Sequence, residues 1–448
     1  MYKTEQMKEN ENKGNSPVKR RDFIKKTATA STGILSAPLI IPSSWKFDPP
    51  SDRIRHAVIG TGGMGGNHVR MFQEAKGSEL VAVCDVDPGQ MDRKLKDLPR
   101  AGRIKRYTDF HKLLDDRSID SVTVATPDHW HTPISLWALM AGKHVFVEKP
   151  CSHNIHETNV LVKAAKEFGK CVQHGTQRRS EGDHIEGIRQ LNQEKVIGDV
   201  HTVKAINHQF RGSIGREGTT LPPAGVDYDM WLGAAPKVPF TKNRWHYAWR
   251  WFWDYGGGDT MNDGVHQIDV AIWALGNRYP NRTIVSGGQF FYNDDHENPD
   301  TQTAILEYGN SQIIWEMRLW TPYDLEGHDN ANVAYGTEGK MEFGRKGVFV
   351  TKGDKQFKIV SPQQVETIVP NFLTAVRAND PGKLLSPIEV GAVTTNICHT
   401  INIGNRIGAA SLVYHPIKET IEAPGFNEQA KDLLSRSYRK GYELPYDR

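Results

Sequence analysis

Lys149 is the residue of this sequence whose type and setting best suit proton transfer. It stands between Glu148 and Pro150, directly after the apolar run His144–Val147. The ring of Pro150 disfavours helical backbone at the lysine, so the amine is expected at the end of a strand. A desolvated lysine has a lowered pKa and can pass a proton to or from a reacting hydroxyl. The alternative is a surface lysine paired with Glu148.

A second group of candidate residues follows the glycines Gly256–Gly258 in what is predicted to be a helix. Asn262 and His266 share one face of this helix, whereas Asp263 is rotated by about 100° from Asn262. A histidine titrates near neutral pH, so His266 is the candidate general acid/base beside Lys149. The alternative is a buried structural histidine. The spacing of His and Asp here is not diagnostic of a metal site, and none is predicted.

A glycine turn supplies the third group. Gly60–Gly65 reads Gly-Thr-Gly-Gly-Met-Gly between an apolar run and a predicted helix, Met64–Glu74. Such a turn lets the backbone approach a diphosphate and directs the N–H groups of the helix at it. Asp85 ends the next apolar run, where a carboxylate accepts from ribose hydroxyls and repels a 2′-phosphate. This favours NAD over NADP; the alternative is a tight turn without a ligand.

The elements that position these residues alternate between strand and helix from residue 54 to 177. This pattern predicts a doubly wound parallel sheet of the Rossmann type, with ligands at the carboxyl ends of its strands. The loops that contain Gly60–Gly65, Asp85, Thr126–His131 and Glu148–Pro150 all fall at those ends.

From residue 178 the pattern changes to strand-like runs with inserted helices, which predicts a C-terminal α/β domain with a large, mostly antiparallel open sheet. Gly264 interrupts one of the helices. Glycine costs roughly 1 kcal/mol there relative to alanine, which indicates that another group approaches its backbone closely. The predicted domains are residues 1–46 (targeting segment and linker), 52–177 and 178–448.

The segment Trp245–Tyr255 carries four of the eleven tryptophans of the chain. Flat aromatic faces stack on the C–H faces of sugar rings, so a saccharide site would use such side chains. Trp249, Trp253 and Tyr255 lie nearest the glycines and are the candidates for contact with a ligand. The alternative is packing in a core or an interface.

The order and spacing of these motifs resemble those of the glucose–fructose oxidoreductase / inositol dehydrogenase (Gfo/Idh/MocA) family. The resemblance rests on Gly60–Gly65, Asp85, the segment 125–131, Glu148–Pro150 and Gly256–Gly258 followed by His266. It implies a Rossmann domain, an α/β domain whose open sheet often forms the oligomer contact, and therefore a homo-oligomer. It also implies reversible hydride transfer between a sugar or polyol carbinol and a nicotinamide.

In this family the lysine corresponding to Lys149 polarises the substrate oxygen, and Asp128 stands where the family often has asparagine near the nicotinamide ribose. The common pattern has an aspartate at the position of Asn262. Either Asp263 replaces it, or Asn262 only orients substrate hydroxyls. His131 is expected to hold its loop, while His129 is a candidate contact to either ligand. The predicted cofactor contacts are Gly60, Thr61, Gly62, Gly63, Met64, Gly65, Asp85, Thr126, Pro127, Asp128, His131, Glu148 and Lys149. The predicted substrate contacts are Arg178, Trp249, Trp253, Tyr255 and His129.

The N-terminus resembles a twin-arginine export signal, with Arg20-Arg21 before a weakly apolar stretch, Thr27–Ile41. It predicts a periplasmic protein and the twin-arginine machinery as a partner; the alternative is a disordered basic tail. Residues 1–46 hold nine Lys/Arg against four Asp/Glu, so the rest of the chain is slightly acidic and nucleic-acid binding is not expected. The four cysteines are expected to be mostly buried thiols, and no transmembrane helix is expected.

Together these features predict an exported NAD-dependent oxidoreductase that acts on a carbohydrate. Because free cofactor is scarce outside the cytoplasm, we expect tightly held NAD(H) that is regenerated within the site. The alternative is a glycosidase that oxidises its sugar transiently and cleaves the glycosidic bond by elimination. A third reading is a cofactor-bound sensor without turnover, which Lys149 and His266 argue against.

Overall fold

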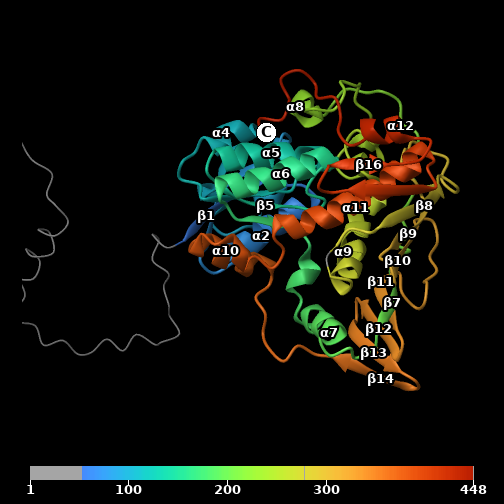
Figure 1. Ribbon diagram of the computed structural model, residues 1–448. Helices are drawn as coiled ribbons and strands as arrows, with labels where there is room; N and C mark the ends of the chain where they lie inside the picture. The colour runs from blue at the N-terminus through green and yellow to red at the C-terminus, as the bar shows by residue number, and fades with distance from the viewer. Residues whose placement is uncertain (1–52, 277, 447–448) are drawn as a thin grey trace, which may run out of the picture. The chain divides into compact units, whose positions relative to one another are not determined.

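The computed structural model describes residues 53–276 and 278–446 (Figure 1). The predicted targeting segment, residues 1–46, lies outside the described residues. The described residues all belong to one compact unit. None of the helices among the described residues combines the length and hydropathy needed to cross a bilayer.

The first sheet has six parallel strands in the order β3-β2-β1-β4-β5-β6, the doubly wound topology expected from the sequence. The strands are β1 Ile54–Ile59, β2 Ser78–Cys84, β3 Lys105–Tyr107, β4 Ser121–Val124, β5 His144–Val147 and β6 Val172–His174. The helices that cover them are α2 Gly63–Glu74, α3 Pro88–Leu95, α4 Phe110–Leu114, α5 His131–Met140 and α6 Ile155–Phe168. Every residue of β4, β5 and β6 is buried, as continuous apolar runs in a parallel sheet require.

Side chains cap the starts of α3, α4 and α6 in this layer, whereas α2 and α5 have no side-chain cap. The side chain of Asn154 accepts from the backbone N–H of Glu157 at 2.9 Å, and the Glu157 carboxylate accepts from the N–H of His153 at 3.1 Å. This reciprocal pair starts α6. Helix α5 begins at His131, directly after the 3-10 turn Asp128–Trp130, so Thr132 lies inside the helix although its residue type would suit a cap. The Thr132 hydroxyl donates instead to the carbonyl of Cys151 at 2.9 Å.

The second sheet has ten strands in the order β14-β13-β12-β11-β7-β10-β9-β8-β15-β16 and is antiparallel except between β7 and β10. This confirms the predicted large, mostly antiparallel sheet. The strands are β7 Val200–Asn207, β8 Arg282–Gly288, β9 Thr301–Glu307, β10 Gln312–Arg318, β11 Asn330–Gly336, β12 Gly339–Gly344, β13 Gly347–Lys352, β14 Lys355–Ile359, β15 Ser411–His415 and β16 Thr420–Glu422. The accompanying helices are α7 Gly182–Asn192, α8 Tyr228–Leu232, α9 Val265–Ala274, α10 Ile368–Ala378, α11 Ile388–Ile407 and α12 Asn427–Asp432.

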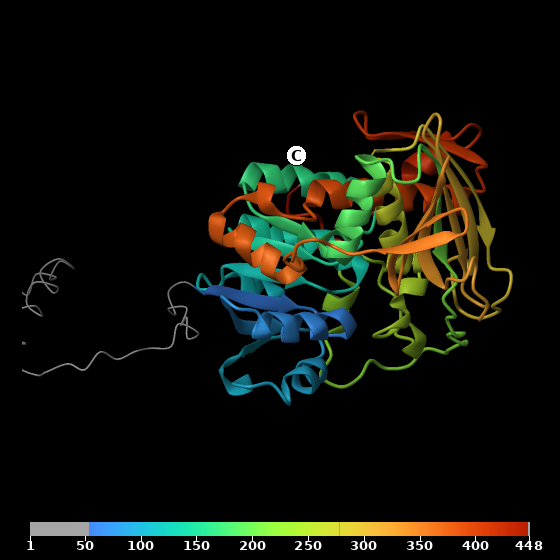
Figure 2. The ribbon, with the colours of Figure 1, turned by 90° about the horizontal axis from the view of Figure 1, so that it is seen from below.

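Helix α9 contacts β7, β10 and β11, and α11 contacts β8 and α6. Figure 2 shows α9 between the two sheets. The chain after residue 360 returns to the first sheet, where Phe372 of α10 meets Phe72 and Phe146 with ring centroids 6.2 and 5.7 Å apart. The two sheets therefore share a packed interior, and the cavity described next is built between fixed walls.

Candidate active site

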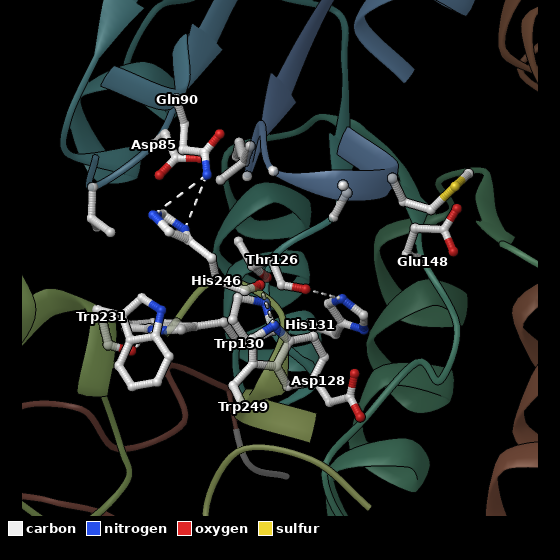
Figure 3. A pocket seen from close by; sticks show the side chains of 18 of the residues that line it. Asp85, Gln90, Thr126, Asp128, Trp130, His131, Glu148, Trp231, His246 and Trp249 are labelled. Carbon is white, nitrogen blue, oxygen red and sulfur yellow. Dashed lines mark hydrogen bonds between the residues drawn. The ribbon is translucent and has the colours of Figure 1, made fainter. Parts of the chain in front are cut away.

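A cavity of about 450 Å³ lies at the carboxyl ends of the first sheet (Figure 3). One wall is the glycine turn with the loops after β2, β4 and β5. The opposite wall comes from the second region of the chain, namely residues 230–231 and a segment that we call the strap, residues 245–250. Asn262, just before α9, closes the end next to Lys149.

The glycine turn is shaped for a ligand. Gly60 has a φ of 83°, and a Cβ there would lie 2.7 Å from the backbone of Ala125. A Cβ at Gly65 would lie 1.8 Å from the carbonyl oxygen of Gly60, so turn and helix pack backbone to backbone. Gly62 and Gly63 line the cavity with nothing within 4 Å of a Cβ position. No side chain caps the start of α2. Open space before free N–H groups fits a diphosphate.

Asp85 is fixed against this turn and lines the cavity. Its carboxylate accepts from the N–H and hydroxyl of Thr61 at 2.7 and 2.9 Å and from the N–H of Asp87 at 3.0 Å. Burial raises the pKa of Asp85, while these donors oppose the shift. Thr61 therefore positions Asp85 and is not among the lining residues. The remaining lone pairs of the carboxylate are available to a ribose diol.

His131 holds the loops after β4 and β5 together, as expected from the sequence. Its ring nitrogens lie 2.8 Å from the carbonyl of Thr126 and 2.5 Å from that of Pro150. Thr126, Pro127 and His131 all line the cavity.

Asp128, in the same loop, also lines the cavity and is buried. Burial raises its pKa to about 8, although Lys149 and Arg250 act in the opposite direction. Asp128 is therefore largely protonated at pH 7, which brings it close to the asparagine that the resemblance implied for this position.

Lys149 is not a surface lysine paired with Glu148. The buried Glu148 carboxylate accepts from His68 at 2.7 Å and from the backbone N–H of Lys149 at 3.1 Å. Burial would raise the pKa of Glu148, but the hydrogen bond from His68 and the nearby positive charges hold it at about 2. The Lys149 amine lines the cavity and donates to the backbone carbonyl of Asn262. The first sheet and the segment before α9 thus meet at this amine.

The helix predicted around His266 contains a π turn, Thr260–Gly264, before α9 begins at Val265. A Cβ at Gly264 would lie 2.8 Å from the ring of Trp315 on β10. The close approach expected at this glycine is therefore an indole ring. π turns inside helices are frequent at functional sites, because they redirect backbone and side-chain groups.

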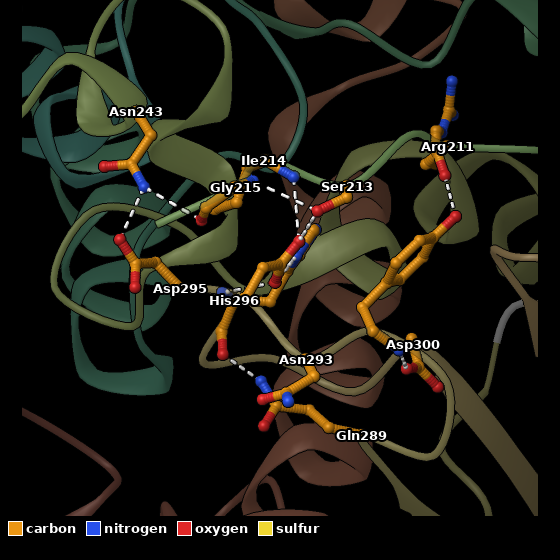
Figure 4. A network of polar contacts seen from close by, with 12 residues as sticks. Arg211, Ser213, Ile214, Gly215, Asn243, Gln289, Asn293, Asp295, His296 and Asp300 are labelled. Atoms are coloured by element: carbon orange, nitrogen blue, oxygen red, sulfur yellow. Dashed lines mark hydrogen bonds and ion pairs between the residues drawn. The ribbon is translucent and has the colours of Figure 1, made fainter. Parts of the chain in front are cut away.

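Around this turn the carboxylates are tied into a network with Arg211, which is anchored by the loop 211–216. Asp263 accepts from Arg211 and Gln209, and the amide of Asn262 donates to Asp259 at 2.8 Å. Asp294 accepts from the Ser213 hydroxyl at 2.5 Å, and the Tyr292 hydroxyl donates to the carbonyl of Arg211. Figure 4 shows part of the network that holds the loop, in which the Asn243 amide donates to Asp295 at 2.7 Å. Burial would raise the pKa of Asp263, but Lys149 and Arg211 outweigh it and the net shift is downward.

His266 and Asp263 are not among the residues that line the cavity. His266 is nevertheless close enough to Lys149, Asp263 and Glu148 for their charges to affect its pKa. Burial, assisted by the charge of Lys149, lowers the pKa of His266 to about 4. The imidazole is therefore neutral at pH 7 and is a proton acceptor rather than a donor. Among the described residues no group of three His, Cys, Asp or Glu side chains is arranged to hold a metal ion.

Of the predicted substrate contacts, Trp249 lines the cavity, and Arg178 binds Glu181 at 2.9 Å while its charge reaches His266. The other three predictions are corrected. His129 is fully buried, with its ring 2.9 Å from the carbonyl of Trp231, and Tyr255 is fully buried beside it with ring centroids 5.3 Å apart.

Trp253 lies outside the cavity, where its indole N–H donates to the carbonyl of Glu297 at 3.0 Å and Arg406 stacks over its ring. Half of the aromatic run therefore packs the interior, and only the strap faces the cavity.

The sequence did not single out several lining residues. These are Met230, Trp231, Trp245, His246, Tyr247 and Arg250. A feature of the sequence that could have identified some of them is that His246 and Arg250 are polar residues within an aromatic run.

A groove that is lined by the glycine turn and Asp85 and ends at the Lys149 amine is the arrangement of an NAD-binding oxidoreductase of the Rossmann class. Two family models agree with this assignment. Residues 54–176 match the "Oxidoreductase family, NAD-binding Rossmann fold" model and residues 195–298 match the "Oxidoreductase family, C-terminal alpha/beta domain" model, together about half of the chain. The chain therefore belongs to the Gfo/Idh/MocA oxidoreductase family.

Curated relatives match only part of this chain. A glycosyl hydrolase family 109 protein from Shewanella pealeana is 30% identical over 173 residues, which are 34% of this chain and 38% of that protein. An alpha-N-acetylgalactosaminidase from Shewanella oneidensis is 29% identical over 174 residues, again 34% and 38% of the two chains. The match spans well under half of the length of these relatives.

Solved structures share the fold over most of the chain. An aldose-aldose oxidoreductase from Caulobacter crescentus, complexed with glycerol, has a TM-score of 0.62 at 17% identity, covering 80% of this chain and 99% of that one. The WlbA dehydrogenase from Bordetella pertussis, in complex with NADH and UDP-GlcNAcA, has a TM-score of 0.60 at 19% identity, covering 80% and 98%. These likenesses establish the fold.

Proposed function

We propose that this protein transfers a hydride between a carbohydrate carbinol and a tightly held NAD. The observation that carries the proposal is the meeting of two chain regions at one end of the cavity. There the Lys149 amine donates to the carbonyl of Asn262, four residues before His266 on the next turn. The amine lies in the groove, and the neutral imidazole of His266 follows one turn after Asn262. An amine and a base of this kind are the groups that such a reaction needs.

In this proposal, separate residues of the chain bind the cofactor and transfer the proton. The turn Gly60–Gly65 binds the diphosphate, and Asp85 binds the adenosine ribose. The Asp85 carboxylate would repel the 2′-phosphate of NADP, which favours NAD. Lys149 donates a hydrogen bond to the reacting oxygen and stabilises its developing negative charge. His266 accepts the hydroxyl proton. When bound, the nicotinamide supplies the hydride acceptor or donor.

Retention of the cofactor is supported by the strap. Residues 245–250 cross the groove opposite the glycine turn, and His246 lies 3.0 Å from the Gln90 amide and 3.2 Å from the Asp87 carboxylate (Figure 3). A dinucleotide under this segment would leave only when the segment moves. The relatives of similar fold that bind NADH, glycerol or a nucleotide sugar support a sugar-like substrate.

The test begins with the nucleotide. Purified protein is unfolded, the released nucleotide is identified, and glycosides are screened for reduction of the bound NAD. We expect one NAD(H) per chain, and Lys149→Ala is expected to keep it while its turnover falls about 10²–10⁴-fold. The surface variant Lys163→Ala, which loses only an ion pair to Glu419, is the control. Protein that carries no nucleotide and binds none contradicts the proposal.

A second candidate function is favoured by the family 109 relatives, one of which is named an alpha-N-acetylgalactosaminidase. Transient oxidation of a ring carbon by NAD acidifies the neighbouring C–H, and the glycosidic oxygen then leaves by elimination. Water adds to the resulting unsaturated ketone, and the NADH formed in the first step reduces the ketone back to the alcohol. Release of sugar from a nitrophenyl glycoside without net formation of NADH selects this reading. Net formation of NADH or of a second reduced sugar selects the oxidoreductase.

Export through the twin-arginine pathway and a homo-oligomer built on the open face of the second sheet remain predictions. Cell fractionation with an Arg20→Lys/Arg21→Lys variant tests export, since the paired arginines are the recognition signal. Light scattering of the purified protein tests the oligomer. A cytoplasmic wild-type protein would contradict the first prediction and a monomer the second.

A further inference from the structure

Arg250 places a guanidinium in the cavity wall without an acidic partner. Its Nη1 donates to the carbonyl of Tyr247 at 2.8 Å, and the group stacks over the ring of Tyr247 at 4.0 Å. Its Nε is buried and has no hydrogen-bond partner among the described residues. The acids around it are engaged elsewhere, since Asp259 and Asp263 pair with Arg211.

This arrangement holds the charge in one orientation. The guanidinium lies over the rings of both Tyr247 and Trp249, 4.0 and 4.9 Å from their centroids, and its hydrogen bond to the carbonyl of Tyr247 fixes one edge. Arginine stays protonated in proteins, and a charge that is removed from water without a counter-charge is costly. A planar guanidinium whose N–H donors are held in one orientation in a cavity matches the geometry of an oxyanion.

The location of Arg250 separates two possible sources of that oxyanion. Its charge acts on Asp128, which follows β4. In the sheet, β4 lies between β1, which leads into the glycine turn, and β5, which leads to Lys149. A Cβ at Gly256 would lie 2.9 Å from the Cα of Arg250, and the glycines at 256–258 lead directly to the turn that contains Asn262, whose carbonyl accepts from Lys149. Arg250 therefore lies at the reacting end of the groove, whereas Asp85 lies at the adenosine end.

We propose that Arg250 binds an oxyanion carried by the sugar, so that the preferred substrate is an acidic sugar such as a uronic acid glycoside. This substrate class rests on the proposed function of the site. The other source of the same chemistry is the diphosphate of the dinucleotide, and the experiment distinguishes the two.

The test uses methyl β-glucuronide and methyl β-glucoside, which differ only in the carboxylate at C6. We compare wild type, Arg250→Gln and Arg250→Lys. The control is Arg244→Gln, because Arg244 also donates to a backbone carbonyl and stacks on a ring, yet does not line the cavity. The readouts are kcat/KM for each glycoside and the Kd of NADH for each variant.

We expect wild type to prefer the glucuronide at least tenfold in kcat/KM, and Arg250→Gln to remove that preference while the glucoside changes less than threefold. Arg250→Lys keeps part of the preference and Arg244→Gln all of it. A wild type that prefers the glucoside overturns the inference. So does an Arg250→Gln variant that weakens NADH binding tenfold with the preference intact, because it assigns the guanidinium to the diphosphate.

The outcome for the proposed function is read separately. If wild type binds the glucuronide in calorimetry and Arg250→Gln does not, the binding inference stands even where neither glycoside is oxidised. In that case the proposed oxidation of a sugar fails while the oxyanion contact holds.

Discussion

At the scale of single residues, the balance of charges around His266 decides the direction in which protons move. Burial and the charge of Lys149 favour the neutral ring, whereas Asp263 and Glu148 favour the protonated one. Burial and the charge of Lys149 have the larger effect, so the pKa of His266 falls to about 4. A neutral imidazole beside an ammonium group suits oxidation of a hydroxyl, because the ring takes the proton while the amine holds the oxygen.

The pH dependence of sugar oxidation should report this balance. A base with a pKa of about 4 stays competent from neutral pH downward and is lost only as pH falls through about 4. We expect kcat/KM for oxidation to stay level between pH 7 and 5 and to fall about tenfold per unit below pH 4.

His266→Gln should lower the level value of kcat/KM about 10²–10⁴-fold and should remove its fall below pH 4. The control is His201→Gln, which changes an exposed histidine. A limb at pH 6.5 in wild type would mean that the ring is solvated or that another group is the base.

The sequence predicts the position of a residue in the fold when that position is set by the residues directly next to it. Gly60–Gly65 and Asp85 follow apolar strands directly, and Lys149 is fixed by its own proline, so local order places all of them at one edge of a sheet. His129 and Tyr255 could not be placed in this way. Which side of the aromatic run faces the cavity depends on packing against Trp231, which comes from a different part of the chain.

At the scale of elements, two departures from regular structure build the far wall of the site. The π turn before α9 directs the carbonyl of Asn262 at Lys149, and a one-dimensional helical pattern cannot predict it. The strap depends on Gly256, where a Cβ would lie 2.9 Å from the Cα of Arg250. The glycine motif was therefore a correct signal of a functional site, but its physical reason is the passage of the strap beside it.

The contacts by which His246 of the strap binds to the first sheet's loop can be tested by mutation. His246 has a left-handed backbone with a φ of 55°, which asparagine tolerates better than most residues. His246→Asn keeps this backbone and removes the ring that contacts Gln90 and Asp87. A lost hydrogen bond of about 1 kcal/mol corresponds to a roughly fivefold faster dissociation of the nucleotide.

Energy transfer from the cavity tryptophans to NADH, followed after a chase with NAD, measures the rate. His415→Asn, which removes a histidine–glutamate pair on the second sheet, is the matched control and should leave the rate unchanged. An unchanged rate in His246→Asn would show that the strap is not what retains the cofactor.

At the scale of the whole molecule, the two sheets differ in how far their sequences determine them. Five strands of the parallel sheet were predictable because they are short, mostly apolar runs between helices, whereas β3, Lys105–Tyr107, is largely exposed and has no such pattern. Four strands of the second sheet, β11, β14, β15 and β16, had no counterpart in the sequence prediction. Four of the five residues of β14 are exposed, and an edge strand of this kind lacks the alternation that identifies a half-buried strand.

The two layers are joined by an interior that contains many buried histidines. Burial lowers the pKa values of His129, His174 and His399 to about 3 and those of His144 and His266 to about 4. In the unfolded chain a histidine binds its proton near pH 6.5. Below that pH the unfolded state therefore holds more protons than the folded state, and the folded state loses stability as pH falls.

We expect the free energy of unfolding to decrease as pH falls below 6.5, because each of these histidines binds its proton more readily in the unfolded chain. Equilibrium urea titrations at closely spaced pH values measure this slope. His399→Asn should reduce the slope by one histidine's share, whatever it does to stability at pH 7, because the ring of His399 is buried with its Nε2 3.2 Å from the Ser152 hydroxyl. The exposed His201→Gln should leave the slope unchanged. A free energy of unfolding that is level between pH 6.5 and 5 would mean that the interior admits protons without unfolding, and the neutral state assigned to His266 would then lose its physical basis.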